Sequence, residues 1–196
     1  MWNALYGAER GMVAPGAQAT IADGIGVQSP GALTLPLIRE RVGEMLLVGE
    51  DDIELAILTL LEIEKTVVEG AGAAGLAALM KHRGRFAGRN VGLVLCGGNI
   101  EPLVLAEIIE RGMARSGRLA RLRCDVRDVP GALADLAALL ARLGANIEQV
   151  RHQRTFTTLS VERVQIEVVV HTRGVEHVEE ILEAMRGEGW RAERVG

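Results

Sequence analysis

The sequence is poor in aromatic residues, cysteine and lysine, and each shortage excludes something. Phe, Trp and Tyr make up 3% of the 196 residues, so the core must be aliphatic. Cys96 and Cys124 lie far apart without metal-ligand spacing, and the amino terminus lacks a basic segment followed by an apolar stretch, so a reducing cytoplasm is the default expectation. Of the 22 basic residues only Lys65 and Lys81 are lysines, which limits any chemistry that needs an amine.

Long apolar runs and basic stripes are also missing. No run approaches the roughly 18 residues of a membrane helix. The net charge is −4, with arginine and glutamate interspersed, so the electrostatic footprint of a protein that binds a phosphate backbone is absent. Apolar residues make up 48% and charged residues 24%, which is typical of a globular chain. We therefore expect a folded protein whose partners are neither nucleic acid nor membrane.

The first half of the chain has strong helical patterns and few strand patterns. Over 49–65, apolar residues recur on one helix face and acidic residues fill the first turn, which predicts an amphipathic helix. Further helices are predicted over 70–81 and 102–115. The runs 45–48 and 91–96 are short and apolar, as the strands of a buried parallel sheet are.

Two strands are too few for such a sheet, because parallel sheets are covered on both faces and independent sheets have three or more strands. The first 31 residues have no clear period, and a structureless stretch of that length is uncommon inside a compact domain. Residues 1–117 are therefore interpreted as an incomplete α/β domain that needs a further segment.

Residues 118–196 are complete by the same test. The predicted elements are a strand over 120–127, a helix from Pro130 to Gly144, strands over 146–156 and 163–170, a helix over 175–185 and a strand over 190–195. The helices should bury Leu133, Leu136, Ala137, Leu140, Val175, Val178, Ile181, Leu182 and Met185. The order βαββαβ indicates a ferredoxin-like sandwich with both helices on one face of an antiparallel sheet. Its exposed edges favour association of two copies around a ligand crevice.

Three glycine-containing stretches are candidate ligand sites. TIADG joins a short predicted strand to Gly24, VVEGAGAAG places Glu69 before a glycine cluster, and LCGGN places Cys96, Gly97 and Gly98 after an apolar run. The third is the most informative, because open α/β folds bind ligands at the carboxyl ends of strands. The alternatives are a tight turn for the Gly-Gly pair and a solvated helix-start charge for Glu69.

Dinucleotide and metal sites are not expected. GAGAAG lacks both a preceding apolar strand and an acidic residue about 20 residues on, which argues against NAD. The small residues there favour close helix packing. Cys124 is expected in the core. The histidines are dispersed without metal-ligand spacing and are expected on the surface: His82, His152, His171 and His177.

The turn RDVPGAL is a candidate site for a small amino acid. Asp128 precedes a helix with Gly131 in its first turn, so backbone amides around Val129 are free to meet a carboxylate. Asn146 is expected near this turn if the second strand pairs beside the first. The alternative is that Asp128 only caps the helix, and the spacing leaves both interpretations open.

Together these stretches resemble the threonine ammonia-lyase (threonine dehydratase) family of pyridoxal-phosphate enzymes. TIADGIGV, PGALTLPLIRE, EIEKTVVEGAGAAGLAAL and VGLVLCGGNI are similar in order and spacing to the carboxyl-terminal part of its catalytic domain, which has fold type II, the tryptophan synthase β-like α/β fold. RDVPGAL through LGANIEQVRHQRTF resembles its ACT regulatory domain. The resemblance implies a partial catalytic domain over 1–117 and an ACT domain over 118–196.

The resemblance also implies a pyridoxal-phosphate site. Cys96 matches the position that hydrogen-bonds the pyridine nitrogen, Gly24 matches a glycine whose backbone approaches the ring, and Glu69 lies near that ring, with Gly97 and Gly98 lining the same end. A neutral partner at the nitrogen suits β-elimination, because an unprotonated pyridine is a weaker electron sink and restrains competing carbanion chemistry.

Other parts of the family's pattern have no counterpart in these residues. They are the lysine-bearing motif, the substrate loop and the glycine tetrad that holds the phosphate, and neither Lys65 nor Lys81 matches the reactive lysine. Without that lysine, neither the Schiff base nor the base for the α-proton is supplied. The chain is therefore expected to be inactive alone and is not expected to retain the cofactor by itself.

Three functions follow from the resemblance and its departures. The first is a part of an enzyme that converts L-threonine to 2-oxobutanoate and ammonia, with serine as a second substrate and an ACT domain that senses isoleucine or valine. The second is a non-catalytic amino-acid-binding module whose dimer acts as a sensor. The third is complementation, in which a separate chain supplies the lysine-bearing half.

Overall fold

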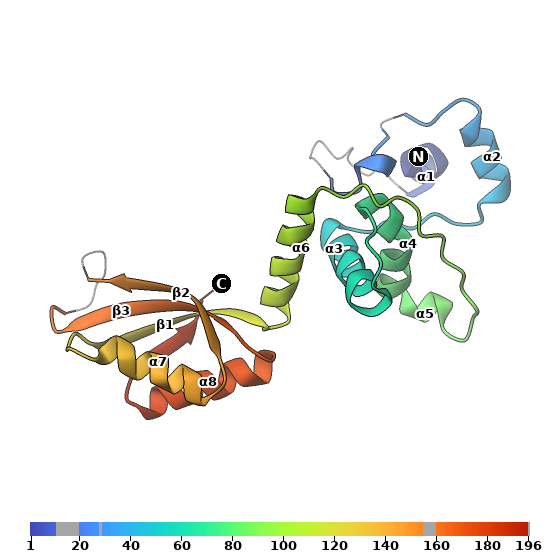
Figure 1. The fold of residues 1–196 in the computed structure, drawn as a ribbon. Coiled ribbons are helices and arrows are strands. Elements are labelled where there is room, and N and C mark those ends of the chain that lie inside the picture. Colours follow the sequence, from blue (N-terminus) through green and yellow to red (C-terminus); the bar gives the residue numbers. More distant parts are fainter. Residues whose placement is uncertain (11–19, 28, 155–159, 196) are drawn as a thin grey trace. The chain divides into compact units, whose positions relative to one another are not determined.

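The chain folds into two compact units, residues 1–109 and 110–196 (Figure 1). The computed structural model describes residues 1–10, 20–27, 29–154 and 160–195. Each unit has a hydrophobic core of its own. None of the helices described is both long enough and apolar enough to cross a membrane.

The first unit is built from helices. The elements through the unit boundary are α1 (Trp2–Arg10), the 3-10 turn η1 (Asp23–Ile25), α2 (Thr34–Arg41), α3 (Glu50–Thr59), the π-helical turn η2 (Leu60–Glu64), α4 (Gly70–Lys81), α5 (Arg83–Phe86) and α6 (Pro102–Arg115). The helices predicted over 49–65, 70–81 and 102–115 are confirmed, the first of them as α3 followed by η2.

The pair α3 and α4 forms the centre of this unit. Gly49 caps α3, and its backbone N–H donates to the Asp52 carboxylate at 2.8 Å. The face predicted from periodicity is buried, with Ile53, Ala56, Ile57 and Leu60 in the core. On α4, Ala73 and Ala77 are fully buried, because their small side chains let the two helices approach closely.

The predicted strands of the first unit are not formed. Residues 45–48 and 91–96 belong to no helix or strand of the described structure, and residues 20–22 lead into η1 instead of forming a strand. A strand needs a neighbour for its backbone groups, and an apolar sequence does not supply one. Val94 is 85% exposed as a result.

The amino-terminal stretch contains a helix that periodicity did not reveal. α1 occupies part of the first 31 residues, and Trp2 and Tyr6 on it meet edge to face with ring centroids 5.5 Å apart. Two turns of helix contain too few apolar residues to set a clear period. The expectation of a wholly structureless start was therefore wrong for residues 2–10.

The second unit has the predicted βαββαβ order. Its elements are β1 (Leu119–Arg127), α7 (Ala132–Arg142), β2 (Asn146–Gln153), β3 (Arg163–His171), α8 (Val175–Gly187) and β4 (Arg191–Arg194). The sheet order is β2-β3-β1-β4, every pairing is antiparallel, and both helices lie on one face (Figure 1). The predicted end of the second strand, at Phe156, lies outside the described residues.

The core of this unit follows strand alternation. The buried residues of β1 stand opposite those of β3, as in the pairs Leu122↔Val168 and Cys124↔Ile166. They pack with Leu136 and Leu140 of α7 and with buried residues of α8. Burial, followed by the nearby Asp125 charge, raises the pKa of the Cys124 thiol to about 12. The prediction that Cys124 belongs to the core is confirmed.

Three side chains lie differently from their predicted positions. Leu133 and Val175, in the first turns of α7 and α8, are exposed, and Leu139, which the predicted buried face did not include, is buried. α7 begins at Ala132 and not at Pro130, because Gly131 adopts a left-handed conformation with φ 97°. The first-turn leucine is therefore held away from the sheet.

His177 is the fourth difference, since it is buried and not on the surface. The backbone N–H of Arg173 donates to its Nδ1 at 3.1 Å, and Nε2 lies 2.9 Å from the Leu143 carbonyl oxygen. Nδ1 must be unprotonated to accept, so Nε2 carries the proton that it donates to Leu143. His177 thus joins the start of α8 to the end of α7.

Candidate functional site

The three glycine stretches of the first unit meet at the amino end of α4. Glu69 precedes this helix, and its backbone N–H donates to the Gly97 carbonyl at 3.1 Å. Its carboxylate accepts a hydrogen bond from the Asn99 backbone N–H at 3.2 Å. A Cβ placed on Gly24 would lie 3.4 Å from Glu69 Oε1. Glu69 therefore lies between the other two stretches.

Glycine is required where the chain crosses α4. A Cβ on Gly70 would collide with the Ile21 carbonyl, and one on Gly72 would collide with the Cys96 carbonyl. Gly97 has φ 81°, in the left-handed region, and a Cβ there would overlap the Glu69 carboxylate. The small residues of GAGAAG therefore admit two loop segments as well as the neighbouring helix.

Cys96 and Gly98 belong to the same cluster with fewer constraints. The Cys96 thiol is exposed. Gly98 would accept a Cβ, since the nearest atom, the Val67 carbonyl oxygen, would be 3.5 Å away. The plain turn interpretation thus suits Gly98 better than Gly97, whose conformation and contacts both demand glycine.

Both lysine amines are engaged away from this cluster. Lys65 Nζ donates to the Glu62 carbonyl at 2.6 Å, and Lys81 Nζ lies 2.6 Å from Asp52 Oδ2. The hydrogen bond from Lys81, with that from the Gly49 backbone, lowers the pKa of the Asp52 carboxyl.

The RDVPGAL turn holds an ion pair. Both carboxylate oxygens of Asp128 accept hydrogen bonds from Arg154, at 2.8 and 2.9 Å. This bond, and the Arg154 charge, lower the pKa of the Asp128 carboxyl. Asp128 does not cap α7, whose N-cap residue is Gly131 without a side-chain bond. The capping alternative is therefore wrong.

A hollow of about 230 Å³ lies beside this turn. Its lining includes Val129 from the candidate set and Trp190 from the turn before β4. Asn146 does not reach it within one chain, because β2 pairs with β3 and Asn146 stands opposite His171, at the other end of the sheet. The separation along the strands is roughly 30 Å, at about 3.3 Å per residue.

Sequence reasoning missed Arg154 and Trp190 at this end of the domain. Arg154 lies past the end of β2 and its pairing with Asp128 depends on how the strands are ordered, which periodicity does not contain. Trp190 had a weak signal, because it is one of only two tryptophans in the chain. The described residues contain no group of three His, Cys, Asp or Glu side chains able to hold a metal ion.

Comparison with known families matches both units. Residues 3–97 match the family described as pyridoxal-phosphate dependent enzyme, and residues 120–187 match the ACT domain. The chain joins a pyridoxal-phosphate enzyme segment to an ACT domain. The fold class predicted from the sequence, a partial α/β segment followed by a ferredoxin-like domain, is confirmed.

Known relatives resemble both parts together. An L-threonine ammonia-lyase of Geobacter sulfurreducens is 42% identical over 171 residues, which cover 87% of this chain and 42% of that protein. The L-threonine ammonia-lyase of Thermotoga maritima is 41% identical over 177 residues, covering 90% and 44%. A solved structure of a T.th. threonine deaminase is 40% identical over 45% of this chain and 31% of its own, with a TM-score of 0.41. The chain spans less than half the length of the curated relatives named here.

Cys96 is the residue of this cluster whose chemistry suits the cofactor, since an exposed thiol can hydrogen-bond a pyridine nitrogen. The space beside Gly97 is taken by the Glu69 carboxylate, and a Cβ on Gly24 would contact Ala71 and Glu69. Both lysine amines are bonded to other groups. The described residues therefore offer a donor for the pyridine nitrogen and lack a placed amine for the cofactor aldehyde.

Proposed function

We propose that this chain supplies the carboxyl-terminal part of a pyridoxal-phosphate-dependent L-threonine ammonia-lyase, together with its ACT amino-acid sensor. The reaction is conversion of L-threonine to 2-oxobutanoate and ammonia. The observation that carries the proposal is the cluster of Gly24, Glu69 and Gly97 at the amino end of α4, where two of these glycines closely approach one carboxylate. The match of residues 3–97, which include this cluster, to pyridoxal-phosphate-dependent enzymes and the match of residues 120–187 to the ACT domain support the proposal.

The residues of the cluster would divide the work of holding the cofactor. Pyridoxal phosphate, when bound, would withdraw electrons from the amino-acid substrate. Cys96 would hydrogen-bond the pyridine nitrogen, Gly97 and Gly98 would line the same end, and Gly24 would let the backbone approach the ring. Glu69 would hold the loop through Asn99, so its carboxylate acts on loop position.

The chain alone is proposed to be inactive. Each lysine amine already has a partner outside the cluster, so no amine stands where the cofactor aldehyde would be. Purified chain supplied with pyridoxal phosphate and L-threonine should therefore release no 2-oxobutanoate. Borohydride reduction followed by peptide mapping should find no coenzyme on Lys65 or Lys81.

Matched variants make the outcome decisive. Turnover that disappears in Lys65→Arg but persists in Lys81→Arg, or the reverse, would identify a reactive lysine and overturn the proposed inactivity. Turnover that survives in both variants would point to a contaminating enzyme, and the double variant should then retain it undiminished.

The ACT domain is proposed to bind a small amino acid at the RDVPGAL turn. Asp128, Val129 and Gly131 would form the site in one copy, and Asn146 would come from a second copy, because the two ends lie far apart within one chain. Isoleucine and valine are the proposed effectors. Calorimetric titration with each should give saturable heat, and no heat with either would leave this turn without a ligand.

A purely regulatory module is the second candidate. It is favoured by the complete core of residues 110–196, which needs nothing from the first unit to bury its strands. In that case the effector binds while no combination of cofactor and threonine gives product. The experiment that separates the two is addition of a protein that carries the lysine-bearing half of the family's domain, since only the first candidate predicts that turnover then appears.

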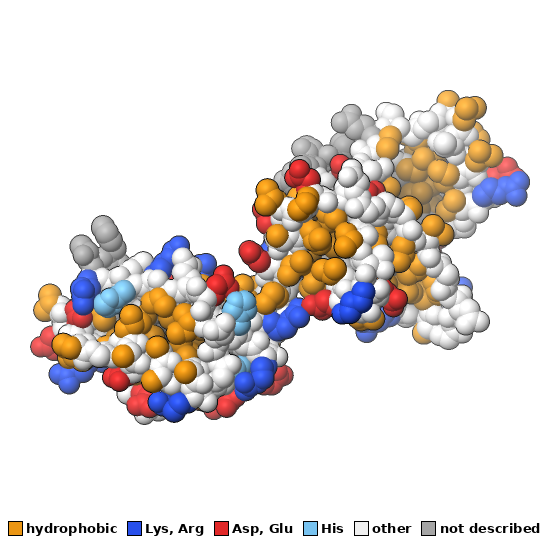
Figure 2. Space-filling view, in the orientation of Figure 1, with side chains coloured by type: hydrophobic (Ala, Val, Ile, Leu, Met, Phe, Trp, Pro, Cys, Tyr) orange, Lys and Arg blue, Asp and Glu red, His pale blue; other side chains and the backbone are white. Residues whose placement is uncertain are grey.

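The first unit also has surface that suits such a partner. Apolar side chains are exposed across it (Figure 2), including Leu33, Val94 and Leu103 at 75% or more. Contiguous exposed apolar surface marks interaction sites. We further propose that the protein is cytoplasmic and acts in isoleucine biosynthesis. We also propose that it forms homo-oligomers through the ACT domain, and size determination in solution tests this oligomeric state.

A further inference from the structure

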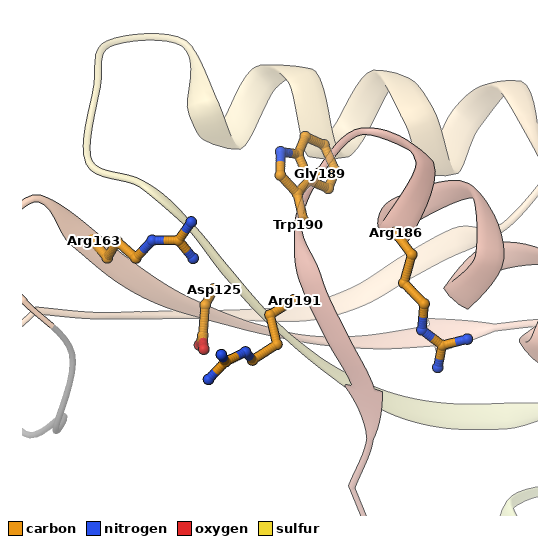
Figure 3. A pocket seen from close by; sticks show the side chains of 6 residues that line it. All are labelled: Asp125, Arg163, Arg186, Gly189, Trp190 and Arg191. Atoms are coloured by element: carbon orange, nitrogen blue, oxygen red, sulfur yellow. The ribbon is translucent and has the colours of Figure 1, made fainter.

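Three arginines line a second hollow of the ACT domain. It has a volume of about 460 Å³ and is lined by Asp125, Arg163, Arg186, Gly189, Trp190 and Arg191 (Figure 3). This volume is within the range of small-molecule sites. The hollow adjoins the smaller one beside RDVPGAL, with which it shares Asp125, Arg163, Gly189 and Trp190, but it contains none of the residues assigned above to the amino-acid site.

The three guanidinium groups have no carboxylate partner in the part of the chain that the structure describes. Arg186 donates only to the Ala192 carbonyl, at 3.5 Å, and neither Arg163 nor Arg191 is within 4.0 Å of a described carboxylate oxygen. Some other arginines of the domain are paired, as Arg123 is with Glu167 and Glu193.

The charge of the lining favours an anion. Three arginines and the single carboxylate of Asp125 leave two positive charges around the hollow, in a chain whose net charge is −4. Asp125 is 8% exposed, and it accepts a long hydrogen bond from Gln165 at 3.4 Å. Asp125 is therefore less accessible to a solute than Arg186 and Arg191, which are exposed.

We propose that this hollow binds a small oxyanion that carries two negative charges, held by the arginines that line it. Guanidinium groups pair with phosphate and carboxylate oxygens in the same forked geometry, so a phosphate group and a dicarboxylate are two sources of this chemistry. Trp190 also lines the hollow, and its indole packs against the core of the domain.

Trp190 is also the reporter for the test. In a Trp2→Phe background the full chain has one indole, so emission from Trp190 is read directly. Sodium phosphate and disodium succinate are titrated separately at neutral pH and constant ionic strength, with sodium chloride as the balancing salt, and calorimetry gives a second readout. A saturable change with one of the two anions is the expected result, and which anion binds identifies the source.

Arginine variants decide whether the site is the one described. Arg163→Gln and Arg191→Gln should each weaken binding at least about tenfold, since each removes a charge-assisted contact. Arg151→Gln, an exposed arginine on the opposite edge strand β2, should leave the affinity unchanged. Loss of binding in all three variants, a response equal to that of chloride, or no response to either anion would overturn the proposal.

Discussion

Arg154 donates two hydrogen bonds to the Asp128 carboxylate, at 2.8 and 2.9 Å, and so links the chain after β2 to the turn before α7. The two strands that lead to these residues are not neighbours, since β3 lies between them. The ion pair therefore bridges β3 at one end of the sheet, from the end of β2 to the end of β1. Both oxygens of the Asp128 carboxylate, which belongs to the proposed amino-acid site, are therefore already hydrogen-bonded.

The ion pair should be visible in the titration of Asp128. Its pKa is lowered, chiefly by the Arg154 hydrogen bond, so the pair is present at neutral pH and is lost as pH falls through that lowered value. Carbon NMR of the side-chain carboxyl should give a midpoint below the ordinary 3.8. Arg154→Gln should move it upward and Arg151→Gln should not. An unmoved midpoint in Arg154→Gln would show that the pair does not form in solution.

Two adjacent glycines should respond differently to alanine. Gly97→Ala places a side chain at φ 81° and against the Glu69 carboxylate, so we expect a loss of at least about 1–2 kcal/mol in the unfolding free energy. Gly98→Ala meets only an ordinary contact with Val67 and should change it little. Urea unfolding followed by circular dichroism measures both. Equal losses would contradict the cluster described at α4.

The two cysteines should react at very different rates. Cys96 is exposed, whereas burial raises the pKa of Cys124 to about 12 and hides its thiol. A chromogenic disulfide reagent should label one thiol rapidly in the folded chain and the second only on unfolding, and Cys96→Ser should remove the rapid phase. The raised pKa also predicts that stability declines as pH rises from about 9 towards 12, because the unfolded thiol ionises first.

His177 should matter for stability although it was expected on the surface. His177→Phe leaves the Arg173 backbone N–H and the Leu143 carbonyl without their ring partners, which should cost about 1–3 kcal/mol in unfolding free energy. His152→Gln, on an exposed position of β2, serves as the control and should be close to neutral. Thermal unfolding of the two variants is the measurement. A neutral His177→Phe would mean that the two hydrogen bonds contribute nothing net.

Several elements were predictable because their causes are local. The helix that begins after Gly49 has an acidic first turn and an apolar face, and both are properties of neighbouring residues. Val164, Ile166, Val168 and Val170 are buried and recur at every second residue, a pattern that predicts a strand whichever strand it pairs with. Residues 91–96 show the limit of this reasoning, since they are as apolar as a strand and have no neighbour in the described structure.

The sequence by itself determined the βαββαβ order of the second unit, the helices α3, α4 and α6, and the stretches that contain the candidate site. Only the tertiary structure decided that Gly24, Glu69 and Gly97 meet, and that Asn146 and Asp128 stand at opposite ends of one sheet. The physical reason is that periodicity records which face of an element is apolar. Which elements become neighbours depends on packing between residues far apart in the chain, and the periodicity of a single element gives no information about that packing.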